Sequence, residues 1–269
     1  MRQPGPPPIG TRPARTSTAG LQRSMTSLLN LWRWAWYAIL PASCTGCQTT
    51  LSRPRHPFFC DSCWTGLQPI KTPLCPRCGR PFASPVALRY SPLHLCGPCR
   101  TNKPAYSRAH TLYAYESPLR EALHAFKYRH NLAMAAALGQ LLIQALPDRL
   151  DVDLVIPVPL APARLREREY NQSLVLADMA ATTLRIPLDY LSLQRTKEGP
   201  PQTSLTRRAR LSNLRRAFHV VDPTAIRGRR ILLVDDVLTT GTTVNECAKA
   251  LRKAGSGAVT VLTLARTMS

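Results

Sequence analysis

Two adjacent carboxylates, Asp235 and Asp236, follow a run of apolar residues in the stretch 231–243, which reads ILLVDDVLTTGTT. The apolar run predicts a buried strand, and the threonines and glycine after it predict a turn that opens into a helix. Paired carboxylates at such a place can hold ribose hydroxyls and share a Mg²⁺ ion. The alternative is that the acids only cap the next helix. Backbone N–H groups and hydroxyls at the helix N-terminus can cradle a phosphate, and here they belong to Thr239, Thr240, Gly241, Thr242 and Thr243.

This stretch differs from the two best-known phosphate-binding loops. No lysine follows Gly241, which excludes a Walker A loop, and a GxGxxG pattern is absent. A pair of aspartates alone is a weak signal, but the whole string 231–243 is specific. It resembles the signature with which type I phosphoribosyltransferases bind phosphoribosyl diphosphate (PRPP). The resemblance implies a PRPP site with Mg²⁺ as its companion ion.

Eight of the nine cysteines form four CxxC pairs, separated by 12, 11 and 17 residues. Two thiolates three residues apart on a tight turn can face one metal ion, and a second such turn completes a tetrahedron. The pattern predicts two structural Zn²⁺ sites. Sequential pairing would make a double zinc ribbon, and an interleaved pairing stays open. The predicted ligands are Cys44, Cys47, Cys60 and Cys63, followed by Cys75, Cys78, Cys96 and Cys99.

Disulfide bonds are the competing interpretation of these cysteines. The chain shows no export signal, and its nucleotide-type motif favours a cytoplasmic location, where thiols stay reduced. Four thiolates leave a zinc ion no open coordination position, so the expected metals support structure and do no chemistry. Cys247 lies apart in a predicted helix and is expected in the core.

The chain is strongly basic: its formal net charge of +21 divides into +5 for residues 1–40, +8 for 41–108 and +8 for 109–269. Two Zn²⁺ ions on eight thiolates would lower the total to about +17. This excess favours an anionic partner, either nucleic acid or a polyphosphate. Arginine supplies 30 of the 36 basic residues, so a genomic preference for arginine is the alternative cause.

Residues 1–27 are rich in proline, arginine, serine and threonine, which predicts a disordered basic tail; Met25 is an alternative start. The apolar stretch 28–40 is too short for a transmembrane segment, and Arg33 interrupts it. Its spacing predicts a helix docked on the protein, with weak membrane-surface contact as the alternative. We assign residues 28–108 to this helix and the double zinc ribbon.

From residue 109 onward, apolar strand patterns alternate with helical patterns. Strands that are apolar on both faces are typical of a parallel sheet covered by helices on both sides. We therefore expect residues 109–269 to form an α/β domain of the type I phosphoribosyltransferase kind. The expected strands are 109–115, 153–157, 230–234 and 258–265, and the expected helices are 119–128, 132–146, 171–184 and 243–253.

The order of these motifs resembles the ComF family (competence protein F), zinc-bearing phosphoribosyltransferase-like proteins of bacterial DNA uptake. The resemblance runs from about Leu29 to Arg266. The family motif R-G-F-N-Q corresponds to residues 168–172, which read REYNQ, so Glu169 adds bulk and charge where the family has glycine. A short K-Y element corresponds to residues 127–128. A later Q…R…N…F pattern corresponds to Gln202, Arg210, Asn213 and Phe218.

The resemblance also implies roles outside the loop. The turn 157–162, beginning with Pro157 and Val158, would bind the diphosphate through its backbone, and Arg168 would help to neutralise it. The segment 194–218 resembles the mobile loop that closes over PRPP and excludes water. An alternative is that its arginines only solvate a helix face. Its candidate catalytic cations are Arg195, Lys197 and Arg210.

Two functions follow from the resemblance. The first is a PRPP-binding protein that handles single-stranded DNA in natural competence, together with other DNA-uptake proteins. The second is an active phosphoribosyltransferase, which moves ribose 5-phosphate from PRPP to a nitrogenous acceptor and releases diphosphate. The sequence identifies neither a general base nor an acceptor pocket, so retention of enzymatic activity stays open. A zinc-ribbon protein–protein adaptor is a third option.

Overall fold

The computed structural model describes residues 42–51, 55–84, 86–89, 91–128, 133–144, 146–147, 149–196 and 217–268. Several predictions fall outside these ranges. They concern the tail 1–27, the apolar stretch 28–40, and Lys197, Gln202, Arg210 and Asn213 of the segment 197–216. Among the residues that are described, no helix combines the length and the apolar character needed to cross a bilayer.

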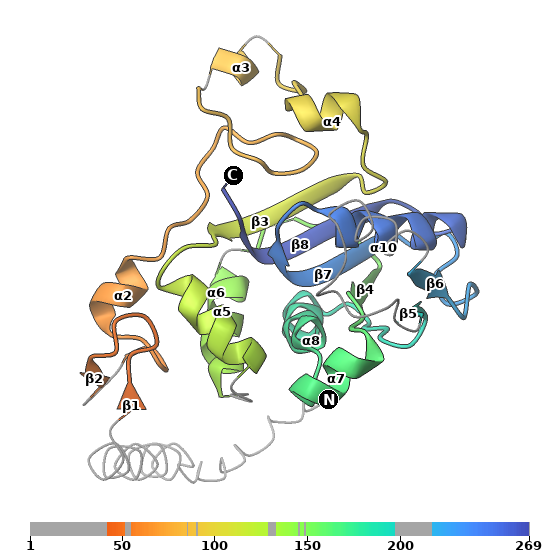
Figure 1. Cartoon of the computed structure of the whole chain (residues 1–269). Coiled ribbons are helices and arrows are strands. Elements are labelled where there is room, and N and C mark those ends of the chain that lie inside the picture. The colour runs from red at the N-terminus through yellow and green to blue at the C-terminus, as the bar shows by residue number, and fades with distance from the viewer. Residues whose placement is uncertain are drawn as a thin grey trace, which may run out of the picture.

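A four-stranded parallel sheet with the order β3-β8-β7-β4 forms the centre of the C-terminal part (Figure 1). This sheet confirms the predicted α/β fold. Its two inner strands are buried along most of their length, because helices cover both faces. The strands are β3 (Arg108–Ala114), β4 (Leu154–Pro157), β7 (Ile231–Leu238) and β8 (Val259–Arg266).

Alternate residues of β7 point into two different apolar layers, as the period of a strand requires. Leu232 and Val234 pack with three helices, α5 (Leu119–Tyr128), α6 (Met134–Gln144) and α8 (Gln172–Leu184). Ile231 and Leu233 pack on the other side with α10 (Thr242–Lys253). The helical spacing of apolar residues had predicted all four of these helices.

Two local features differ from the expectation. Residues 162–168, for which the sequence predicted no helix, form the short helix α7 (Pro162–Arg168), which begins at the end of the expected turn 157–162. Pro162 lies in its first turn, where the fixed φ of proline suits a helix and its missing N–H costs nothing. A small antiparallel hairpin, β5 (Leu193–Arg195) with β6 (Phe218–Val220), joins the two ends of the segment 196–217.

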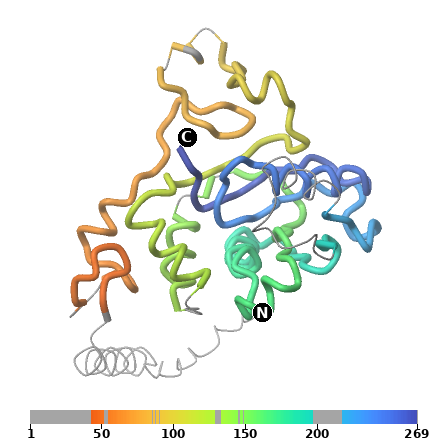
Figure 2. Tube along the Cα trace, viewed as in Figure 1, coloured from red at the N-terminus to blue at the C-terminus, as the bar shows by residue number. Residues whose placement is uncertain are grey.

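The cysteine-rich part forms two separate modules (Figures 1 and 2). The first contains β1 (Ala42–Ser43), β2 (Thr50–Leu51) and α2 (Asp61–Thr65), and it lies against the start of α5. The second contains α3 (Val86–Arg89) and α4 (Gly97–Thr101), and it lies against β3. The chain between the modules runs along β3, with the N–H of Ile70 donating to the carbonyl of Leu112 at 3.0 Å.

Candidate functional site

Asp235 and Asp236 lie within β7, which continues beyond the apolar run to Leu238. The Asp235 carboxylate accepts hydrogen bonds from the Ser173 hydroxyl at 2.8 Å and from the N–H of Asp236 at 3.0 Å. Burial and the neighbouring charge of Asp236 raise the pKa of Asp235 above its ordinary value. The two acids therefore form one electrostatically coupled pair at the end of the sheet.

Lys127 supplies the positive charge beside this pair. Its Nζ lies 2.6 Å from Oδ2 of Asp236, and the side chains of Lys127 and Asp236 are only 18% and 10% exposed. Lys127 comes from the last turn of α5, and Ser173 from the first turn of α8. Neither had been assigned a role from the sequence. The K-Y element was a signal for Lys127, whereas no sequence signal singled out Ser173.

The loop after β7 offers a backbone cradle at the start of α10. Gly241 precedes the helix with φ +77°, a conformation that favours glycine, and the helix has no side-chain cap. Thr240 Oγ1 and Thr242 Oγ1 lie 2.9 Å apart, which folds the hydroxyls toward one another. The N–H of Thr242 reaches Thr240 Oγ1 at 3.4 Å, and the first-turn N–H groups and the helix dipole favour an anion here.

The turn after β4 lies beside the acids, because Pro157 pairs with Val234 in the parallel register. Pro157 has no N–H, and the N–H of Val158 donates to the carbonyl of Val234 at 2.9 Å. The side-chain amide of Asn171 donates to the carbonyl of Val158 at 3.1 Å. Pro157 and Val158 thus fix the shape of the turn. The N–H groups left for a ligand in its described residues are those of Leu160 and Ala161.

Arg168 is buried between three helices, with 6% of its surface exposed. Its guanidinium donates to the hydroxyl of Tyr128 at 3.0 Å and to Oε1 of Gln172 at 3.2 Å, and it stacks 4.8 Å from the Tyr128 ring centroid. In this arrangement Arg168 ties α7 to α5 and α8. Its role in neutralising a diphosphate stays a prediction.

Arg195 ends β5 and lies over the ring of Phe218, 5.5 Å from its centroid. These two residues flank the segment 197–216, so Arg195 is held at the base of the expected closing loop. The other two candidate cations of that loop, Lys197 and Arg210, lie outside the described residues. The structure therefore brings together the two acids, the loop 239–242 after β7 and the turn after β4. The positions of Lys197 and Arg210 relative to them stay a prediction.

The eight paired cysteines gather into two groups of four, in the sequential pairing. Within each group the sulfur atoms lie within 4.8 Å of one another. Four sulfurs at a Zn–S distance of about 2.3 Å lie about 3.8 Å apart in a tetrahedron, and two neighbouring pairs here measure 3.6 Å. The two clusters therefore fit two structural zinc sites. They consist of Cys44, Cys47, Cys60 and Cys63 (the first cluster) and Cys75, Cys78, Cys96 and Cys99 (the second cluster).

The two clusters differ in exposure. All four cysteines of the second cluster are buried, whereas Cys47 of the first is exposed. In the first cluster, hydrogen bonds from the Ser62 hydroxyl and the Cys63 N–H lower the pKa of the Cys60 thiol to about 6. A thiol that ionises readily is a suitable zinc ligand, since the thiolate is the form that binds metal.

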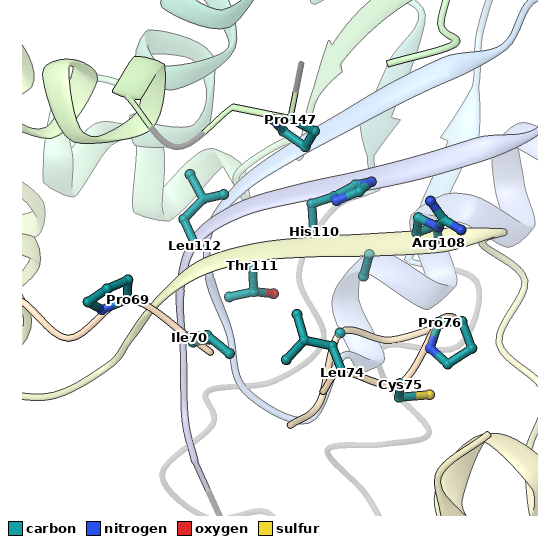
Figure 3. A pocket seen from close by; sticks show the side chains of 12 residues that line it. Pro69, Ile70, Leu74, Cys75, Pro76, Arg108, His110, Thr111, Leu112 and Pro147 are labelled. Atoms are coloured by element: carbon teal, nitrogen blue, oxygen red, sulfur yellow. The ribbon is translucent and has the colours of Figure 1, made fainter. Parts of the chain in front are cut away.

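Two cavities border the second cluster. One, of about 310 Å³, lies between this cluster and the loop 239–242, and Arg80, Tyr106 and Arg266 contribute to its wall. The other, of about 410 Å³, lies between β3 and the chain that links the two modules (Figure 3). Its lining is mainly apolar, with Ile70 and Leu74 across from β3, and it contains none of the residues expected to bind PRPP.

Comparisons with known proteins match this architecture. Residues 35–100 match the double zinc ribbon domain family, and residues 171–269 match the phosphoribosyl transferase domain family. The chain is 34% identical over 236 residues to the "DNA utilization protein YhgH" of Escherichia coli K12, covering 85% of this chain and 99% of that protein. It is 33% identical over 223 residues to "Competence protein F" of Haemophilus influenzae, covering 78% and 97%. The chain belongs to the competence protein F (ComF) family.

More distant similarities surround this assignment. "Competence protein ComFC" of Bacillus subtilis is 28% identical to this chain over 215 residues, which cover 77% of this chain and 83% of that protein. Among solved structures, orotate phosphoribosyltransferase from Aeropyrum pernix is 24% identical, covers 55% of this chain and 64% of that chain, and has a TM-score of 0.33. The phosphoribosyl transferase domain match and the relatives named for DNA utilization and competence support a competence-related, phosphoribosyltransferase-like protein.

Proposed function

We propose that this ComF-family protein binds PRPP with Mg²⁺ at the end of β7 and handles single-stranded DNA during DNA uptake. The observation that carries the first part is the juxtaposition of two neighbouring acids with the N-terminus of α10, where the cap residue Gly241 has no side chain. Carboxylates suit ribose hydroxyls, and the N–H groups of the loop suit a phosphate. Both lie in one continuous segment, 235–243.

The remaining charges of the site fit the rest of the ligand. The N–H groups of Leu160 and Ala161 are available to the diphosphate in the turn beside the acids. Mg²⁺ would offset the negative charge that the acids and the diphosphate bring together. Lys127 already holds Asp236 in a fixed position without the ligand. In this proposal Lys127 keeps the acid pair oriented and limits its repulsion of PRPP.

The second part rests on charge and on family. Residues 41–108 carry a formal charge of +8, which falls to about +4 with two zinc ions on eight thiolates. Positive surfaces of this kind bind the phosphate backbone of nucleic acids in a salt-dependent manner. The relatives named for DNA utilization and competence support a DNA partner. Location in the cytoplasm, and contacts with other DNA-uptake proteins or weakly with the membrane surface, belong to the same proposal.

Phosphoribosyl transfer to a nitrogenous acceptor is the second candidate function. The hairpin β5–β6 favours it, because it holds Arg195 at one end of the segment 197–216, which contains Lys197 and Arg210. In this version the segment closes over PRPP and places cations beside the leaving diphosphate. Acceptor-dependent release of diphosphate would distinguish it from binding without catalysis.

Calorimetric titration with PRPP and Mg²⁺ tests the proposed site. The zinc-loaded protein is expected to bind in the micromolar range, and the double variant Asp235→Asn/Asp236→Asn at least about tenfold more weakly. Its thermal unfolding serves as the folding control, because asparagine keeps the shape of each side chain but leaves the charge of Lys127 without its partner. A folded wild-type protein that gives no heat of binding would refute the PRPP site.

Fluorescence anisotropy with a labelled oligo-dT strand tests the DNA part. We expect binding that weakens steeply with salt, with a negative slope of log K against log[salt] that counts the phosphate contacts. A duplex of the same length is the control for strand preference. Equal binding to duplex, or binding that ignores salt, would contradict the proposed handling of single strands.

A further inference from the structure

The second cysteine cluster lies across a cavity of about 310 Å³ from the loop that is proposed to hold phosphate, and it packs against the helix that follows this loop. Its four cysteines share one apolar core with Val244 and Cys247 of α10. Cys78 and Cys99 form part of the same cavity wall as residues 239–242 of the loop.

One connection runs from this cluster to the beginning of the loop. The carbonyl of Cys78 accepts a buried hydrogen bond of 2.8 Å from the guanidinium of Arg266. Arg266 ends β8 and lies opposite Leu238, the last residue of β7. The N–H of Thr267 donates to the carbonyl of Leu238 at 3.2 Å, and Thr239 follows directly. The position of the Cys78 turn therefore helps to determine where the loop leaves the sheet.

A second connection runs to the end of the loop, where α10 begins. Arg77, which lies between the cysteines of one pair, donates to the carbonyl of Tyr106 at 2.9 Å. The N–H of the adjacent Ala105 donates to the side-chain oxygen of Asn245 at 2.8 Å. Asn245 lies in the first turn of α10, and its own N–H donates to the carbonyl of Gly241 at 3.0 Å. Both ends of the loop are thus tied to the turn 75–78.

The turn itself has little freedom to move. Gly79 has φ +67°, and a Cβ placed there would lie 2.6 Å from the carbonyl oxygen of Ala109 in β3. The N–H of Ala109 donates to the carbonyl of Arg77 at 2.8 Å. A metal ion that joins the turn 75–78 to Cys96 and Cys99 would complete this rigid support.

We propose that Arg266 and Asn245 are positioning residues through which the second zinc site sets the geometry of the phosphate-binding loop, so that PRPP binding and zinc retention at this site strengthen each other. The inference rests on the proposed binding of PRPP. Reciprocity follows from linkage: if zinc favours the loop conformation that binds PRPP, PRPP favours retention of zinc by the same factor.

The first cluster provides an internal comparison within the same molecule. Gly46 of its first turn contacts Pro118, just before α5, whereas Lys127 lies at the other end of this helix. Along the axis of α5, Leu119 and Lys127 lie about 12 Å apart. Ligand binding is therefore expected to affect zinc retention much less at the first cluster than at the second.

Pulse alkylation tests the inference on the full zinc-loaded chain. A zinc chelator and N-ethylmaleimide are added together, with Mg²⁺ alone or with Mg²⁺ and saturating PRPP, and peptide mass spectrometry follows each cysteine pair separately. We expect PRPP to slow alkylation of the second cluster by about fivefold or more, within the usual range of coupling, and that of the first by less than about twofold. Equal slowing at both clusters, or none at either while calorimetry shows binding, would overturn the inference.

Variants of α10 test the route of the coupling. Asn245→Ala removes the acceptor for the Ala105 N–H and leaves both aspartates and the whole loop unchanged. We expect PRPP to bind about three- to tenfold more weakly, and the protection of the second cluster to shrink in parallel. Lys253→Ala, at the exposed far end of the same helix, should change neither quantity. Unchanged protection in Asn245→Ala would contradict the proposed route, and absence of PRPP binding by the wild-type protein would refute the proposed function and this coupling together.

Discussion

Replacement of Lys127 by methionine should destabilise the folded protein, because the acid pair would lose the positive charge beside it. Lys127 and Asp236 are 18% and 10% exposed, and their charged atoms lie 2.6 Å apart. Loss of one partner from a fully buried ion pair costs about 3–5 kcal/mol, because the other charge stays buried without compensation. For this slightly exposed pair we expect the free energy of unfolding to fall by about 2–3 kcal/mol, measured in the absence of PRPP and Mg²⁺.

The loss should depend on pH with a definite sign. The pKa of Asp235 is already raised in the folded protein, first by burial and then by the charge of Asp236. Removal of Lys127 takes away a charge that opposes this rise, so the folded variant holds a proton more tightly than the unfolded chain does. Because the folded pKa of Asp235 is about 7 in the wild-type protein, the stability of the variant relative to wild type should decrease as pH rises above about 7.

A double-mutant cycle measures the coupling energy between Lys127 and Asp236. Urea unfolding of zinc-saturated protein, followed by far-ultraviolet circular dichroism, is measured for wild type, Lys127→Met, Asp236→Asn and the double variant. We expect Asp236→Asn to recover most of the stability lost in Lys127→Met, with a coupling energy of about 1–3 kcal/mol. Costs that simply add within about 0.5 kcal/mol, or a loss that is the same at pH 5 and pH 8, would refute it.

Two further predictions use matched pairs of substitutions. Glu169 has φ +64° after α7, so Glu169→Gly should raise the free energy of unfolding by about 1 kcal/mol, or Tm by about 2–4 °C. Glu167→Gly, inside the same helix, should lower stability by about as much. If both variants change Tm in the same direction, backbone strain at Glu169 is absent. Gly79→Ala should lower the free energy of unfolding by about 2 kcal/mol or more and speed zinc loss from the second cluster, because its Cβ would lie 2.6 Å from a backbone oxygen at φ +67°. Gly97→Ala should be close to neutral, because a Cβ there would meet nothing within 4 Å. Equal zinc-release rates in the two variants would contradict this prediction.

The fold was predictable because its signals are local. Continuous apolar runs marked β4, β7 and β8, and helical spacing marked α5, α8 and α10, so the parallel sheet followed from the order of elements. The strand β7 exceeded its apolar run because Asp235 and Val237 still pair with β8, and a backbone ladder does not require apolar side chains. The helix α7 was missed because prolines usually indicate a loop, although proline is also favoured in a first turn.

The site was predictable only where one segment contains it. Asp235, Asp236 and Gly241 belong to one string, 231–243, and the resemblance of the whole string to the PRPP signature predicted a phosphate-binding loop. Lys127 and Ser173 reach the acids from helices far away in the chain, and only the packing of those helices brings them there. The contact between the second cluster and the loop likewise depends on tertiary structure. In the same way, the sequence alone could not show that Glu169 adopts φ +64°, a backbone conformation that favours glycine.

Hydrogen exchange with mass spectrometry on the intact zinc-loaded protein, with and without PRPP and Mg²⁺, shows whether PRPP binds at the end of β7. The account predicts slower exchange in peptides that cover residues 235–245 and the turn 157–162, with little change at the far end of α10. Protection confined to other parts of the chain, or no protection at ligand concentrations that saturate any binding seen by calorimetry, would contradict the placement of PRPP at the end of β7.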